Sequence, residues 1–254
     1  MLHGTPVDHN QMKNEMEPIF EKRAGWKRIY PDMPGHGRTP AVDSIADSEG
    51  ILTAVEDFMD KVIPNHRFVV AGTSFGGYIA RGLVHNRGSK MDGLFLNNPA
   101  IVQEPSKRLL PPRQIIRKNE TIKEQAKKEK VGGFDEMAVQ QNESVLNYLR
   151  MIKTTVVWSN YDDDFLKKVQ DVSFSFDVDS LSSPFPSPTL FITGRQDSEC
   201  GYRDAWRILE NYPRASFAVL DMAGHLAHAE QPRIWAEMVN EWLDRVEHWT
   251  DYHE

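Results

Sequence analysis

A serine flanked by two glycines stands at the end of a short apolar run. Residues 72–76 read GTSFG, and residues 68–71 before them read FVVA. The pattern Gly-x-Ser-x-Gly is typical of a sharp turn from a strand into a helix, where glycines let backbone segments approach closely. The residues that follow, YIARGLV at 78–84, favour that helix. Ser74 is therefore a candidate nucleophile for attack on a carbonyl carbon.

A serine hydroxyl needs a histidine to accept its proton and a carboxylate to orient the imidazole. Asp197 follows the apolar run at 189–193, and His225 follows the run at 216–220. Because parallel strands present their carboxyl ends at one edge of a sheet, we expect both side chains near Ser74. The order serine, acid, histidine is the order of one known class of catalytic triad.

Other residues compete for these roles. An aspartate such as Asp197 more often forms a turn or caps a helix, but no other acid is equally well placed after a strand. His228 lies three residues beyond His225, which we favour because it is nearer the end of the strand. For His36 and His66, positions in a turn and at the surface are the simpler interpretations.

Short β-type runs alternate with helical patterns along the chain, which indicates a doubly wound α/β fold with a mostly parallel sheet. Apolar residues recur at helical spacing over 51–63 and over 234–246, where Pro232 suits a first helical turn. The predicted strands cover residues 28–30, 68–71, 94–97, 190–193 and 217–220.

The middle of the chain interrupts this alternation. Residues 101–183 contain helical patterns but no convincing strand, and prolines stand on both sides. We predict a core made of residues 1–100 and 184–254, with residues 101–183 inserted as a helical cap over the sheet edge that carries Ser74. Four aromatic residues of the cap either line a substrate pocket or form the cap's own core. They are Phe134, Tyr148, Trp158 and Phe165.

A basic stretch lies within the predicted cap. Residues 107–130 hold nine Lys or Arg and three Glu, in a chain whose net charge is −7. The simpler interpretation is a solvated helical face on which Glu120 and Glu124 pair with nearby lysines. The alternative is a patch that attracts anionic substrates or a partner.

The composition excludes several classes of protein. A net charge of −7 over 254 residues gives no reason to expect nucleic acid as a partner. The single cysteine, Cys200, cannot form an internal disulfide, and no leader or apolar run near 18 residues is evident. We therefore predict a cytoplasmic protein that does not insert into membranes and whose partner is a small-molecule substrate.

Five motifs occur in the order expected of one superfamily. They are LHGTP at 2–6, DMPGHGRT at 32–39, GTSFGG at 72–77, GRQD at 194–197 and GH at 224–225. Together they span nearly the whole chain, which resembles the α/β-hydrolases with a serine nucleophile. The resemblance implies that the backbone N–H groups of Thr5 and Phe75 form an oxyanion hole. It also implies that no cofactor or metal is required.

The resemblance implies a reaction class and leaves alternatives open. A small carboxylic ester is the leading substrate, hydrolysed through an acyl-enzyme, while amide cleavage and carbon–carbon bond hydrolysis use the same triad. A non-catalytic ligand-binding member of the family is an alternative of another class. The family pattern also places a complete strand before the His3-Gly4 pair, so we expect N-terminal strands to be missing from this chain.

Overall fold

The computed structural model describes residues 1–155 and 161–251. Its centre is a sheet of four parallel strands in the order β1-β2-β3-β4, with bounds Phe68–Thr73, Met91–Asn97, Thr189–Gly194 and Ala215–Leu220. Four of the five predicted strands are thereby confirmed. Strands β2 and β3 are buried along their whole lengths, as expected of central parallel strands.

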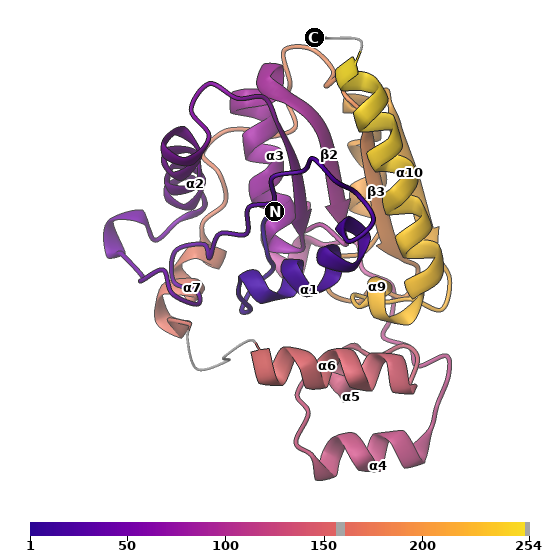
Figure 1. Cartoon of the computed structure of the whole chain (residues 1–254). Coiled ribbons are helices and arrows are strands. Elements are labelled where there is room, and N and C mark those ends of the chain that lie inside the picture. Colours follow the sequence, from indigo (N-terminus) through magenta and orange to yellow (C-terminus); the bar gives the residue numbers. More distant parts are fainter. Residues whose placement is uncertain (156–160, 252–254) are drawn as a thin grey trace.

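Helices cover both faces of the sheet, which confirms the doubly wound α/β fold (Figure 1). Alternate side chains of a strand point to opposite faces. Leu94 and Leu96 pack with α2 (Ser48–Val62) and α3 (Phe75–Arg87), whereas Phe95 packs with α1 (His9–Phe20) and α10 (Pro232–Asp251). The predicted helices at 51–63 and 234–246 correspond to α2 and α10, and Pro232 is the first residue of α10.

The chain between β2 and β3 forms four helices in the residues described. They are α4 (Glu120–Lys128), α5 (Phe134–Met137), α6 (Glu143–Thr155) and α7 (Asp163–Asp171). Helices α4, α5 and α6 pack on one another and form a group at the end of the molecule opposite the C-terminus (Figure 1), with α6 against α1 and α9 (Ala227–Glu230). Helix α8 spans Arg203–Arg207, and short 3₁₀ helices span Asp43–Ile45, Gly88–Lys90, Pro105–Lys107 and Leu209–Asn211.

The aromatic residues predicted for the cap have different surroundings. Phe134 is buried among α4, α5 and α6, whereas Phe165 of α7 is buried in the main core. Tyr148 is half-buried and faces α1, where its hydroxyl donates to Glu15. Trp158 lies outside the described residues. Phe134 and Phe165 therefore fill hydrophobic cores.

The basic stretch makes few local ion pairs in the part of the chain that the structure describes. Lys107 pairs with Glu104 at 2.7 Å, and Lys123 lies 3.7 Å from Asp135. The predicted pairing through Glu120 and Glu124 is not among the ion pairs of the described residues. Most of the stretch is exposed, which agrees with a solvated face.

The predicted strand at residues 28–30 is wrong. Ile29 O accepts a hydrogen bond from the amino group of Met1 at 2.8 Å, but no ladder forms around it in the described chain. A strand is held by such a ladder, so these residues do not form a strand. Leu2 forms an isolated bridge to β1, donating its N–H to Ala71 O at 2.8 Å and accepting from Thr73 N at 3.1 Å. A cavity of about 780 Å³ continues along this edge of β1, away from Ser74, and is lined by Phe20, Trp26, Val62 and Trp242 among others.

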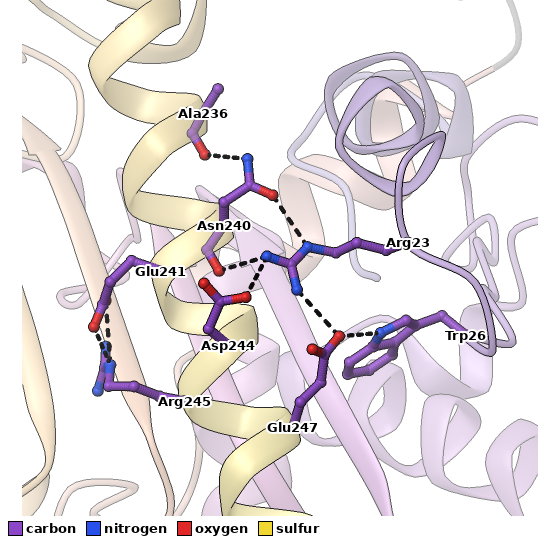
Figure 2. A network of polar contacts seen from close by, with 8 residues as sticks. All are labelled: Arg23, Trp26, Ala236, Asn240, Glu241, Asp244, Arg245 and Glu247. Carbon is purple, nitrogen blue, oxygen red and sulfur yellow. Dashed lines mark hydrogen bonds and ion pairs between the residues drawn. The ribbon is translucent and has the colours of Figure 1, made fainter.

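An arginine attaches the loop after α1 to α10 (Figure 2). Arg23 donates to the side-chain and backbone oxygens of Asn240 at 3.1 and 2.9 Å, to Asp244 at 2.6 Å and to Glu247 at 3.1 Å. Glu247 also accepts from the indole N–H of Trp26 at 2.9 Å. These bonds hold α1 and its loop against the last helix.

None of the described helices is both long and apolar enough to cross a membrane.

Candidate active site

Ser74 lies on a strained turn between β1 and α3. Its φ of 53° and ψ of −118° are rare for a residue with a side chain. A Cβ on Gly72 would collide with the backbone of Gly76, and one on Gly76 would collide with the carbonyls of Leu2 and His3. The two glycines of the motif are therefore required by close backbone approaches, and the turn projects Ser74 at the carboxyl edge of the sheet.

Asp197 and His225 meet at the same edge. The Nδ1 atom of His225 lies 3.1 Å from Oδ2 of Asp197. The other carboxylate oxygen of Asp197 accepts from the backbone N–H groups of Glu199 at 2.8 Å and Cys200 at 3.1 Å. Asp197 is fully buried. Its orientation is thus determined by three hydrogen bonds, and it presents one oxygen to the imidazole.

The pKa values of Asp197 and His225 are shifted in opposite directions. Burial by itself would raise the pKa of Asp197, but the charge and hydrogen bond of His225 and the two backbone N–H groups hold it below its ordinary value. Burial would lower the pKa of His225, but the charge of Asp197 and the hydrogen bond to it raise that pKa well above its ordinary value. An ionised aspartate beside a histidine that binds a proton strongly is the electrostatic arrangement of a general base.

Ser74 is near this pair, but its hydroxyl contacts a different side chain. Its Oγ lies 3.8 Å from Sγ of Cys200. One ligand atom from each of Cys200, Asp197 and His225 lies within 4.8 Å of the others. A bond from Ser74 to His225 is not among the hydrogen bonds of the described residues. Catalytic hydrogen bonds are often long in unliganded enzymes and tighten when substrate binds.

The loop that contains Thr5 packs against Ser74. A Cβ on Gly4 would lie 3.2 Å from Cβ of Ser74, so Thr5, the next residue, is beside the nucleophile. Phe75 is the first residue of α3, and its N–H therefore has no partner within the helix. Thr5 and Phe75 accordingly lie where two backbone donors could face one carbonyl oxygen, although their roles are a proposal.

Two histidines support this loop. The Nε2 atom of His36 accepts a hydrogen bond from the Thr5 hydroxyl at 2.7 Å, while its Nδ1 donates one to Pro34 O at 3.1 Å. His3 bonds Gly4 O through Nδ1 at 2.6 Å and accepts from Met33 N at Nε2, 3.0 Å away. Burial lowers the pKa of His36 and that of His3, the latter to about 3. His36 lies in a turn as predicted, but sequence reasoning missed its contact with Thr5.

Asn98 connects the His225 loop to β3. Its side-chain amide donates to His225 O at 2.9 Å and its carbonyl accepts from Gly194 N at 2.8 Å. Its φ of 42° lies in the left-handed region, which asparagine tolerates better than most residues. In the sequence, the signal for this connecting role of Asn98 was a polar residue directly after a predicted strand.

The competing histidine, His228, has another environment. Its Nε2 lies 3.5 Å from Oε1 of Glu15, which also accepts from the Tyr148 hydroxyl at 2.9 Å. Burial lowers the pKa of His228 to about 3 and raises that of Glu15 to about 8. Because His225 contacts Asp197 and His228 does not, the geometry favours His225 as the base. Sequence reasoning missed Glu15, which lies mid-helix and carries no motif.

Two groups of side chains have the composition of metal ligands in the described chain. One comprises Asp197, Cys200 and His225, and the other comprises Asp8, His9 and Asp32. In the second group Asp32 already accepts from the backbone and imidazole of His9 at 2.8 and 2.7 Å. Its other carboxylate oxygen accepts from the backbone N–H of Arg38 at 3.0 Å, so both oxygens already have partners.

The fold and the order of these residues along it define an α/β hydrolase. The chain matches the model of the alpha/beta hydrolase family over residues 1–238, and it belongs to that family. Among curated relatives, it is 25% identical over 239 residues to a 2-succinyl-6-hydroxy-2,4-cyclohexadiene-1-carboxylate synthase of Klebsiella pneumoniae, covering 91% of this chain and 87% of that one. It is 22% identical over 265 residues to the monoacylglycerol lipase ABHD6 of Bos taurus, covering 99% and 76%.

Solved structures support the same fold. An alpha/beta superfamily hydrolase of Oenococcus oeni superposes with a TM-score of 0.86 at 23% identity, over 97% of this chain and 91% of that chain. An esterase of Exiguobacterium antarcticum superposes with a TM-score of 0.67 at 17% identity, over 96% and 90%. At these identities the likeness concerns the fold alone.

Proposed function

We propose that this protein is a serine carboxylesterase that hydrolyses small carboxylic esters through an acyl-enzyme. The observation that supports the proposal most strongly is the contact between Asp197 and His225 at the sheet edge where the strained turn presents Ser74. Nucleophile, base and orienting acid come from three different loops, and their convergence is what acyl transfer requires.

The proposed reaction has two steps. Ser74 Oγ attacks the ester carbonyl as its proton passes to Nε2 of His225, and the imidazolium is stabilised by Asp197. The N–H groups of Thr5 and Phe75 stabilise the developing oxyanion. His225 then protonates the leaving alcohol. In the second step His225 activates a water molecule, which hydrolyses the acyl group from Ser74.

Residues 101–183 act in this proposal as a cap. Helix α6 packs against α1 and α9, and α9 begins two residues after His225, so the helical group covers the edge of the sheet that carries the proposed base. Glu15, Tyr148 and His228 lie where α1, α6 and α9 meet. The charge of His225 acts on the pKa of Glu15 and on that of His228, so these two lie near the proposed base and are candidates for contact with the substrate.

The names of two similar proteins favour an ester over an amide as the substrate of this chain. They are the bovine monoacylglycerol lipase and the Exiguobacterium esterase. The Klebsiella relative is named a synthase, so membership of the family does not by itself determine the reaction. An alcohol is also an easier leaving group than an amine, and it makes a smaller demand on general acid catalysis.

A series of p-nitrophenyl esters tests the proposal. We expect hydrolysis of the acetate and butyrate, with a pre-steady-state burst of p-nitrophenol and a transient mass increase equal to the acyl group. Ser74→Ala should abolish both, whereas Ser183→Ala, at an exposed serine remote from the site, should abolish neither. Turnover of p-nitrophenyl esters that persists in Ser74→Ala, or hydrolysis of anilide analogues alone, would contradict the esterase assignment.

A further inference from the structure

The only cysteine of the chain lies between the proposed nucleophile and the proposed base. Cys200 Sγ is 3.8 Å from Ser74 Oγ, and it belongs to the group of three ligand atoms with Asp197 and His225 that lie within 4.8 Å of one another. Cys200 is 2% exposed. The proposed hydrolysis has no step for a thiol at this position.

The position of Cys200 is determined by the same residue that orients His225. Asp197 accepts the Cys200 backbone N–H through one oxygen and contacts His225 Nδ1 through the other. Because Nδ1 faces Asp197, Nε2 is the imidazole nitrogen that remains for a further partner, and the His225 side chain also interacts with Cys200. A carboxylate on one imidazole nitrogen with the other nitrogen available is the arrangement found around histidines that bind zinc.

The spacing of the side-chain atoms suits a small tetrahedral cation. Zinc binds thiolate sulfur at about 2.3 Å and imidazole nitrogen at about 2.0 Å, so adjacent ligand atoms in a tetrahedron are roughly 3.3–3.8 Å apart. A sulfur and an oxygen ligand of one zinc ion would be about 3.5 Å apart, so the 3.8 Å between Cys200 Sγ and Ser74 Oγ would need to shorten by only about 0.3 Å. A thiolate and an imidazole together select soft or borderline metals over magnesium or calcium.

We propose that Cys200 Sγ and His225 Nε2, with Ser74 Oγ beside them, form an inhibitory site for Zn²⁺. The metal replaces the proton on the thiol, which passes to solvent, and it occupies the imidazole lone pair. It leaves two positions for Ser74 and water. With Zn²⁺ bound, His225 has no lone pair with which to accept the Ser74 proton. The metal site itself stands on the geometry of Cys200 and His225, while its inhibitory effect rests on the proposed function.

The other group with metal-ligand composition supplies a control. Asp8, His9 and Asp32 contain no thiolate, and their atoms already hold a turn together. His9→Ala removes the imidazole of that group. If zinc binds to this second group and not to Cys200, His9→Ala should weaken zinc binding.

Metal binding is measured directly by calorimetry with ZnCl₂ and by the absorption spectrum with Co²⁺, whose thiolate complexes give a strong near-ultraviolet band. We expect one Zn²⁺ per chain and a thiolate band with Co²⁺ in the wild-type protein. Cys200→Ala and Cys200→Ser should weaken Zn²⁺ binding by at least about tenfold, because losing a ligand exceeds the effect of losing an outer-shell partner. His9→Ala should bind Zn²⁺ like the wild type.

Inhibition is measured separately, as loss of fluorophosphonate labelling relative to each variant's own rate without metal. Zn²⁺ should suppress labelling of the wild-type protein reversibly with EDTA, and Cys200→Ala should require at least about tenfold more metal. Absence of a thiolate band in the wild-type protein, or equal zinc affinity in Cys200→Ala, would overturn the site. Wild-type protein that binds zinc through the thiolate but never labels would instead contradict the proposed function and leave the metal site standing.

Discussion

The carboxylate of Glu230 accepts a hydrogen bond at 2.5 Å from the backbone N–H of Gly224, the residue immediately before His225. The other carboxylate oxygen accepts from the N–H groups of Val139 and Gln140 at 2.6 and 3.1 Å. Glu230 is 4% exposed. One buried side chain therefore connects the loop of the proposed base to the segment between α5 and α6.

Glu230→Gln should lower activity through the position of His225. A glutamine has one acceptor oxygen, and its NH₂ group would face backbone donors, leaving a buried N–H unsatisfied at about 1–3 kcal/mol. We expect kcat to fall by about tenfold or more while KM changes less, with a matching loss of stability. Steady-state kinetics of ester hydrolysis and urea unfolding measure the two effects.

Glu241→Gln is the matched control for that variant. Glu241 is 56% exposed and pairs with Arg245 on the same face of α10 (Figure 2), a type of contact worth under about 0.5 kcal/mol. It should leave both quantities nearly unchanged. Equal kcat in Glu230→Gln and the wild type would exclude a positioning role for Glu230.

The pH dependence of kcat/KM should report His225. The proposed base must be neutral to accept a proton, and Asp197 raises the pKa of His225. Activity should therefore rise with pH as His225 loses its proton. Asp197→Asn removes the main cause of the raised pKa, so the midpoint should move to lower pH while activity falls by about 10³–10⁴-fold. A midpoint that moves upward, or does not move, would argue against the pairing.

Glu15 should make stability depend on pH. Burial raises its pKa in the folded protein from the ordinary 4.5 to about 8. The folded state thus binds the proton more tightly, and this contribution to stability is full below about pH 4.5 and is lost as pH rises through about 8. Each unit of separation is worth about 1.4 kcal/mol.

The variant Glu15→Gln isolates that contribution because a glutamine cannot ionise. Urea unfolding of the wild type and variant at about pH 5 and pH 8.5 should show the wild type losing stability relative to Glu15→Gln at the higher pH. Glu120→Gln, at an exposed glutamate of α4, should show no such trend. A wild-type minus Glu15→Gln difference that is the same at both pH values would show that Glu15 is not buried as a neutral acid.

Arg23 should contribute to the stability of the fold and not to the proposed hydrolysis. Its guanidinium is 14% exposed and contacts three residues of α10 (Figure 2), whereas Arg28 makes an exposed pair with Glu17. Arg23→Ala should reduce the free energy of unfolding by about 1–3 kcal/mol, and Arg28→Ala by clearly less, because solvent screens its exposed pair. Thermal unfolding compares them, and equal losses would show that the Arg23 network contributes little.

Much of the sheet could be predicted because its strands combine apolar runs with abrupt polar or glycine ends. The run before Gly72 and the run before Gly194 both mark strands that end at the site. Residues 28–30 show the limit of such reasoning. Their composition suits a strand, but a strand also needs a neighbour along its length, and local sequence carries no information about that neighbour.

The three residues singled out by motif are brought to one edge of the sheet, because parallel strands direct their following loops there. Cys200, Glu15 and Glu230 could not be assigned from the sequence. Each acts through a contact with a residue distant in the chain or through burial, and neither is visible in local spacing. His36 was likewise interpreted as a turn residue because its contact with Thr5 joins segments 31 residues apart.

The proposed mechanism makes Ser74 the nucleophile that His225 activates. Its most direct test is reaction of the full chain with a fluorophosphonate, followed by mass spectrometry of the peptide that contains residue 74. We expect one phosphonyl group per chain, on Ser74, with labelling abolished in Ser74→Ala and strongly slowed in His225→Ala. Folded wild-type protein that does not label, or Ser74→Ala that labels at the wild-type rate, would contradict it.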